Sequence, residues 1–182
     1  VIRRIVVDVR GGHLDESERD AEDAEPETMP RPDLEQQRVK YYEFWKEWLE
    51  NYPLDDQSQP IKGPVKTTNL FLYMPKESES WVCAVAAEGG GKAGVYLTFR
   101  RNPIGDRIYA ALLEDRSAID AAIGHPVKWS STDKWQAIQI WRDFGDHMLT
   151  QHRAEVQAWL GDVTNRFINA FRPRITSLLH DQ

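Results

Sequence analysis

Cysteine is almost absent from this sequence, whose 182 residues contain one, Cys83. A single thiol cannot form an intrachain disulfide or supply a cysteine-based zinc site. Cys83 stands in an apolar run, where a buried and unreactive thiol is expected rather than a nucleophile. Long apolar runs are lacking too: no stretch reaches the roughly 18 residues of a membrane-spanning helix, and no signal-peptide pattern opens the chain. We therefore expect a cytoplasmic protein that does not associate with membranes.

Motifs for nucleotide binding and nucleophilic catalysis are also missing. The chain contains no P-loop, no dinucleotide-binding fingerprint and no nucleophile elbow. Three adjacent glycines occur at 89–91, but a strand-like run follows them where a phosphate-binding loop would need a helix, so we expect a hairpin turn. The histidines are dispersed, and His147 and His152 are poorly spaced for one helix face. The sequence therefore predicts no catalytic residue, no metal site and no cofactor.

Net acidity is confined to one short segment. The chain carries a net charge of −6, yet residues 13–36 hold ten of its 29 acidic residues and only two basic ones. This segment has three prolines and almost no large apolar side chains, so it cannot bury enough surface to offset the entropy of ordering. We expect a disordered or extended acidic tether over 13–35. The alternative is an acidic decoy that competes with nucleic acid for a basic face.

The tether separates two regions of different character. The apolar pattern of 1–12 predicts a β-strand, which we interpret as the remnant of an upstream domain; recruitment into the downstream sheet is the alternative. From residue 37 onward acidic and basic residues balance, so the rest of the chain is neutral. We expect residues 36–182 to form a single α+β domain.

Apolar periodicity and turn residues predict the elements of this domain. Helices are expected over 35–52, 103–123 and 148–170, and strands over 69–74, 81–87, 93–100, 127–130 and 135–141. Pro173 is expected to interrupt or end the last helix, with a short helical tail over 175–179. The predicted fold class is therefore α+β, with a mainly antiparallel sheet of about five strands and three helices in the order α-β-β-β-α-β-β-α.

The first part of this order is shared with the PD-(D/E)XK nucleases. Those enzymes need an acid on the second strand and an acid-x-Lys on the third to hold a divalent metal. The second strand here, WVCAVAA, and the third, AGVYLTFRR, contain no acid. The nuclease site is therefore absent. A divergent or degenerate metal-dependent nuclease that uses Glu88, Asp106 or Asp143 is kept as the alternative function.

Four segments, taken in order, carry a family resemblance. They are YYEFWKEWLENY, WVCAVAAEGGGKAGVYLTF, LLEDRSAIDAAIGHPVKW and HRAEVQAWLGDVTNRFINAFRPRI. Over residues 36–179 the chain resembles the bacterial and archaeal family called domain of unknown function 4268. The resemblance implies a domain that often follows a nuclease-like region, and hence a context of nucleic-acid processing or defence. Family members often carry an acid near the position of Tyr96, which this chain lacks.

Without a catalytic motif, we expect a non-catalytic binding or assembly module of a larger protein. The candidate contacts for nucleic acid or another anion are Arg100, Arg101, Arg107, Arg172 and Arg174, because a guanidinium fork fits phosphate geometry. The alternative is that these arginines solvate a strand end and complement a helix C-terminus. Expected partners are an upstream domain of the same polypeptide or a second copy of the chain, with nucleic acid as a further option.

Overall fold

The computed structural model describes residues 31–180. The strand predicted over 1–12, and the tether as far as residue 30, lie outside the described residues. Helix α1 spans Arg31–Asn51, so it begins four residues before the predicted start at Glu35. Asp33 stands in its first turn, where a carboxylate complements the positive end of the helix dipole. The acids of this segment therefore favour a helix start here, not a continuing tether.

The predicted antiparallel sheet of five strands is confirmed. Its strands are β1 (Asn69–Tyr73), β2 (Ser80–Ala87), β3 (Lys92–Phe99), β4 (Lys128–Ser131) and β5 (Gln136–Asp143). Every neighbouring pair is antiparallel, and the spatial order is β1-β2-β3-β5-β4. The short 3₁₀ helices η1 (Lys76–Ser78) and η2 (Glu88–Gly90) make the first two turns. Gly91 ends η2 with a φ of 60°, which glycine adopts without strain, so the predicted glycine hairpin is also confirmed.

The described residues form five α-helices, whereas the sequence predicted three. Besides α1 they are α2 (Pro103–Glu114), α3 (Arg116–Ile123), α4 (Met148–Gln151) and α5 (Arg153–His180). The predicted helix over 103–123 breaks at Asp115, whose carboxylate accepts a hydrogen bond from Arg174 Nε at 2.7 Å. The predicted helix from Met148 breaks at His152, so its first turn stands apart as α4.

The prediction that Pro173 interrupts or ends the last helix is wrong, because α5 continues through it to His180. A proline removes one backbone donor, at a cost that packing can offset. Phe171 and Ile175, on either side of Pro173, are fully buried in the core. Thr176 Oγ1 also donates to the carbonyl of Arg172 at 2.9 Å, which ties the turns together across the proline.

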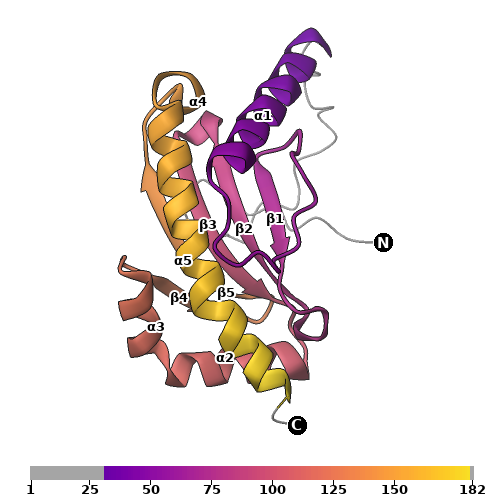
Figure 1. Ribbon diagram of the computed structural model, residues 1–182, viewed down its shortest axis with the longest axis vertical. Coiled ribbons are helices and arrows are strands. Elements are labelled where there is room, and N and C mark those ends of the chain that lie inside the picture. Colours follow the sequence, from indigo (N-terminus) through magenta and orange to yellow (C-terminus); the bar gives the residue numbers. More distant parts are fainter. Residues whose placement is uncertain (1–30, 181–182) are drawn as a thin grey trace, which may run out of the picture.

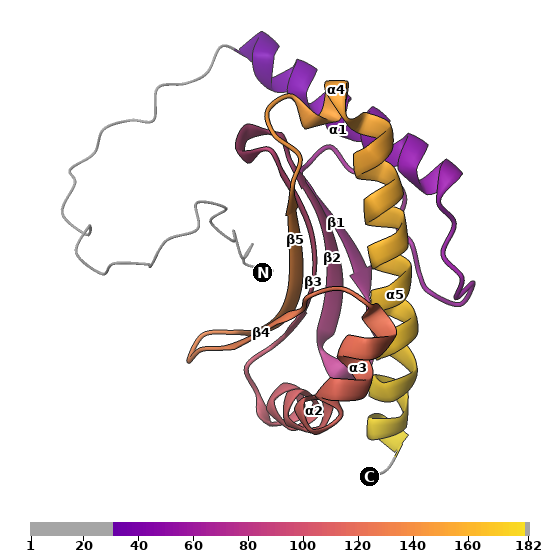
Figure 2. The same cartoon turned by 90° about the vertical axis from the view of Figure 1, so that its left-hand side faces the viewer.

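The helices gather on one side of the sheet (Figures 1 and 2). Seen edge-on in Figure 2, the sheet is curved, with α1, α3 and α5 against one face and α2 beneath its lower end. The main core fills the space between that face and the helices, and the buried tryptophans Trp45 and Trp48 belong to it. Trp48 Nε1 donates to the carbonyl of Gln157 at 3.1 Å, so α1 and α5 are joined by a hydrogen bond within the core.

Candidate binding surface

The five arginines predicted to bind anions do not form one cluster. Arg100 and Arg101 follow β3, Arg107 lies on α2, and Arg172 and Arg174 lie on α5. On α5, Arg172 pairs with Asp56 in the loop after α1, whereas Arg174 pairs with Asp115 between α2 and α3. The last two guanidinium groups therefore point to different parts of the molecule.

Each of these arginines contacts a partner within the chain. Arg100 Nε lies 3.4 Å from Glu79 Oε2, and Arg101 Nε lies 3.0 Å from Asp106 Oδ1. Arg107 Nη1 donates to the carbonyl of Leu178 at 3.2 Å. These contacts give all five side chains a structural role in joining loops and helix ends.

The acids of the alternative nuclease hypothesis are also separated. Glu88 precedes β3 and Asp106 follows it, so the length of that strand, roughly 25 Å, lies between them and they cannot share a metal ion. Glu88 forms an ion pair with Lys40, and Asp143 Oδ1 accepts from the backbone N–H of Gly145 at 2.8 Å. Within residues 31–180, no three side chains of His, Cys, Asp or Glu are grouped as a metal site would require.

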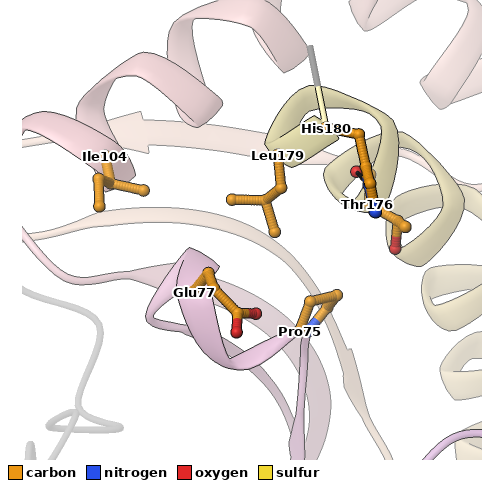
Figure 3. A pocket seen from close by; sticks show the side chains of 6 residues that line it. All are labelled: Pro75, Glu77, Ile104, Thr176, Leu179 and His180. Carbon is orange, nitrogen blue, oxygen red and sulfur yellow. Dashed lines mark hydrogen bonds between the residues drawn. The ribbon is translucent and has the colours of Figure 1, made fainter. Parts of the chain in front are cut away.

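One pocket of about 500 Å³ lies between η1, the start of α2 and the end of α5 (Figure 3). Its lining comes from η1, the start of α2 and the end of α5: Pro75, Glu77, Ile104, Thr176, Leu179 and His180. His180 Nδ1 lies 2.6 Å from the carbonyl oxygen of Thr176 in its own helix. Three of the six lining residues are apolar and three are polar, with a single carboxylate from Glu77.

The face of the sheet opposite the helices carries a row of aromatic side chains. Strand register places on this face the rings of Phe71, Tyr73, Trp81, Tyr96 and Trp141, together with Cys83, Val85, Ala87, Gly94 and Gln139. We call it the open face, because no helix among the described residues lies over it (Figure 2). The packed cluster at its centre is built from β2, β3 and β5 alone. Phe71 and Tyr73 are 37% and 39% exposed, so the aromatic surface reaches solvent at β1.

Trp141 lies over a position where only glycine fits. A Cβ at Gly94, its cross-strand partner, would stand 2.3 Å from Trp141 Cε3 and 2.6 Å from Cδ2. The indole ring stacks on Tyr96, with centroids 6.5 Å apart and an angle of 26° between the planes. Its Nε1–H donates to Gln139 Oε1 at 2.8 Å. Contacts with Gly94, Tyr96 and Gln139 thus fix the orientation of the Trp141 ring on the sheet.

Burial keeps the ionisable groups at the centre of the open face neutral. Cys83 is fully buried, as the sequence predicted, and burial raises the pKa of its thiol to about 12. Burial likewise raises the pKa of the Tyr96 phenol, and the neighbouring Cys83 raises it further. Neither group has the depressed pKa of a nucleophile, so this centre supports packing and binding rather than covalent chemistry.

Charge on the open face is mainly positive. Lys92 and Lys128 lie on it by register, and Lys62 Nζ stands 4.6 Å from the centre of the Tyr73 ring. Among residues 31–180, none of these three lysines forms an ion pair. Asp143, opposite Lys92, is the one acid that register places on this face. Among the described residues, the open face therefore combines aromatic rings with three ammonium groups and one carboxylate.

Sequence reasoning missed this surface as a site. The sequence of β2 is apolar on both sides, which indicates that both faces of the sheet are buried at this strand. The absence of an acid at Tyr96 was also recognised from the sequence. The rings come from four strands, however, and only strand order and register bring them together.

Comparison with known proteins gives a family but no characterised relative. Residues 40–175 match the family described as Domain of unknown function (DUF4268). We found no matching curated protein and no matching solved structure. None of the helices within 31–180 combines the length and apolar character needed to cross a bilayer. Since the match covers most of the chain, the protein belongs to the DUF4268 family.

Proposed function

We propose that this chain is a non-catalytic binding or assembly module that holds its partner on the open face. The observation that carries the proposal is the aromatic surface on the helix-free side of the sheet. Exposed aromatic side chains grouped on one face are typical of interaction sites, because large rings contribute much contact area at little cost in entropy. The open face offers Phe71, Tyr73, Trp81 and Trp141 for such contact, and Tyr96 supports them from below.

We place the module within a larger bacterial protein of the cytoplasm that takes part in nucleic-acid processing or defence. The family resemblance supports this context. A nuclease activity would contradict the non-catalytic part of the proposal. Incubation of the full chain with plasmid, single-stranded DNA and RNA in Mg²⁺ or Mn²⁺ should leave all three intact, whereas cleavage that is lost in Glu88→Gln or Asp143→Asn would establish the enzyme alternative.

The binding part of the proposal can be tested before a partner is known. A photo-crosslinking phenylalanine analogue is placed at Tyr73 on the open face or, as a control, at Leu113 on α2. The two side chains are matched in exposure, at 39% and 43%. After irradiation of living cells that express the full chain, we expect a discrete crosslinked product from position 73 only. Equal products from both positions, or a product from Leu113 alone, would contradict a binding site on the open face.

A further inference from the structure

We infer that the partner of the open face is single-stranded nucleic acid, held by base stacking on the aromatic rings and by lysine contacts to phosphates. The inference rests on the proposed function and names the ligand class. Proteins that bind single strands without sequence preference combine aromatic platforms with a positively charged path for the backbone. The open face has both the aromatic rings and the positive charges, which come from the strands of the sheet and from Lys62 in the loop before β1.

The rings are arranged as a stacking platform. Tyr73 and Trp81 are direct cross-strand partners on β1 and β2, and Phe71 is two residues from Tyr73 on the same side of β1. On β5, the Trp141 side chain lies over Gly94 and is half-buried, so part of it reaches solvent. An unpaired base can lie on such rings whatever its identity, because every base has a π-face. Paired bases inside a duplex cannot, so the surface favours single strands.

The lysines supply the charges that a phosphate backbone requires. Lys62 lies beside Tyr73 at the β1 side, Lys92 lies at one end of β3, and Lys128 lies on the opposite edge strand, β4. They therefore surround the aromatic rings rather than forming a single patch. Elsewhere in the described residues, several arginines, such as Arg153 and Arg174, are bound to carboxylates, whereas the exposed Lys46 and Lys76 form no ion pair there. The three lysines of the open face, set against one carboxylate among the described residues, thus favour a polyanionic ligand.

A second copy of the chain fits the open face less well. Two such faces brought together would bury the same three lysines against a surface whose one acid placed by register is Asp143. Buried ammonium groups without partners are strongly unfavourable. A phosphate backbone instead neutralises each lysine and releases counterions, which is itself a driving force for binding.

Fluorescence anisotropy with the full chain tests the inference. The probes are labelled oligothymidylate and oligouridylate of about 12 nucleotides, which exceeds the smallest site sizes of single-strand binding folds. At a low salt concentration of about 50 mM both should bind, and the corresponding duplex should compete weakly. Loss of one stacked base in Tyr73→Ala should weaken binding roughly 5- to 150-fold. Tyr73 is exposed, so this change leaves the core intact.

A charge-matched pair of variants separates the lysine contribution from net charge. The double variant Lys92→Gln/Lys128→Gln removes two charges from the open face, and Lys46→Gln/Lys76→Gln removes two from exposed positions on α1 and η1. If both lysines contact phosphates, the first variant should lower the slope of log affinity against log salt by about 1.4, at about 0.7 per contact for a single strand. The second should leave that slope unchanged.

The outcomes distinguish the inference from the proposed function. Binding of single strands that weakens in Tyr73→Ala and in the open-face lysine variant, but not in the control variant, supports the inference. No binding by the unaltered chain, or equal loss in both lysine variants, overturns it. In that case a crosslink from position 73 to a protein, or to a second copy seen by light scattering, would retain the open face as a binding site. Absence of that crosslink would remove the proposed function as well.

Discussion

The contact between Gly94 and Trp141 gives the sharpest prediction, because a methyl group added at Gly94 would overlap with the indole ring of Trp141. In Gly94→Ala the new Cβ would lie 2.3 to 2.7 Å from three atoms of the indole ring, closer than any ordinary contact. The ring must turn away, and it then loses its stack on Tyr96 and strains the 2.8 Å hydrogen bond to Gln139.

The size of the effect follows from two opposing terms. Overpacking of this kind costs about 1–3 kcal/mol. Replacing glycine by alanine inside a strand returns about 0.5–1 kcal/mol, since glycine loses the most conformational freedom on folding. We therefore expect a net loss of up to about 2.5 kcal/mol in the free energy of unfolding, measured by urea denaturation with the m-value unchanged.

A double-mutant cycle makes this prediction specific. In a Trp141→Ala background the collision is removed, so Gly94→Ala should become neutral or stabilising by about 0.5–1 kcal/mol. Gly89→Ala, where no atom lies within 4 Å of the new Cβ, serves as the control and should change stability little. A loss caused by Gly94→Ala that is the same with and without Trp141 would refute the proposed position of the indole ring.

Four further predictions concern Cys83, Gly161 and two of the arginines. Burial raises the pKa of the Cys83 thiol from its ordinary 9.0 to about 12, so the thiol of the unfolded chain ionises first. The contribution of Cys83 to the free energy of unfolding should therefore stay constant below pH 9 and fall as the pH rises towards 12, as measured by urea denaturation across this range. The same thiol should resist iodoacetamide in the folded protein and react once urea unfolds it. Gly161→Ala should lower the thermal midpoint, because its Cβ would stand 2.7 Å from Tyr52 Cδ1 where α5 meets α1; a raised midpoint would contradict this close approach. Arg100→Ala/Arg101→Ala should change oligonucleotide affinity less than about twofold, because both side chains already contact carboxylates; a loss of about tenfold or more would assign phosphate binding to these arginines.

Local patterns were enough to predict the sheet. The strand limits of β2 and β3 and their hairpin follow from apolar runs separated by three glycines, which are signals within a few residues of one another. The helices were less predictable, because their breaks depend on distant partners. Asp115 separates α2 from α3 while bound to Arg174, and Pro173 is tolerated because Phe171 and Ile175 are anchored in the core. Neither the hydrogen bond to Asp115 nor the packing beside Pro173 can be recognised from the neighbouring residues in the sequence.

The candidate site required the tertiary structure for a similar reason. Arg101 has the residue type of a phosphate contact, but whether it is free depends on Asp106 and Thr132, which reach it only in the folded chain. The open face has no motif of its own, because only strand order and register place residues such as Tyr73 and Trp141 on the same face of the sheet. The arginines were predicted as phosphate contacts from their residue type, whereas the aromatic surface of the open face follows from strand register and was not predicted.

The location of the ligand can be read directly from the indole N–H signals of the tryptophans in an NMR titration. Trp81 and Trp141 lie on the open face, whereas Trp45 and Trp48 are buried on the helix side and donate to the carbonyls of Thr67 and Gln157. On addition of oligothymidylate to the full chain, we predict that the Trp81 and Trp141 signals shift while the Trp45 and Trp48 signals stay in place. Shifts confined to Trp45 and Trp48, or no shift at saturating oligonucleotide, would contradict binding at the open face.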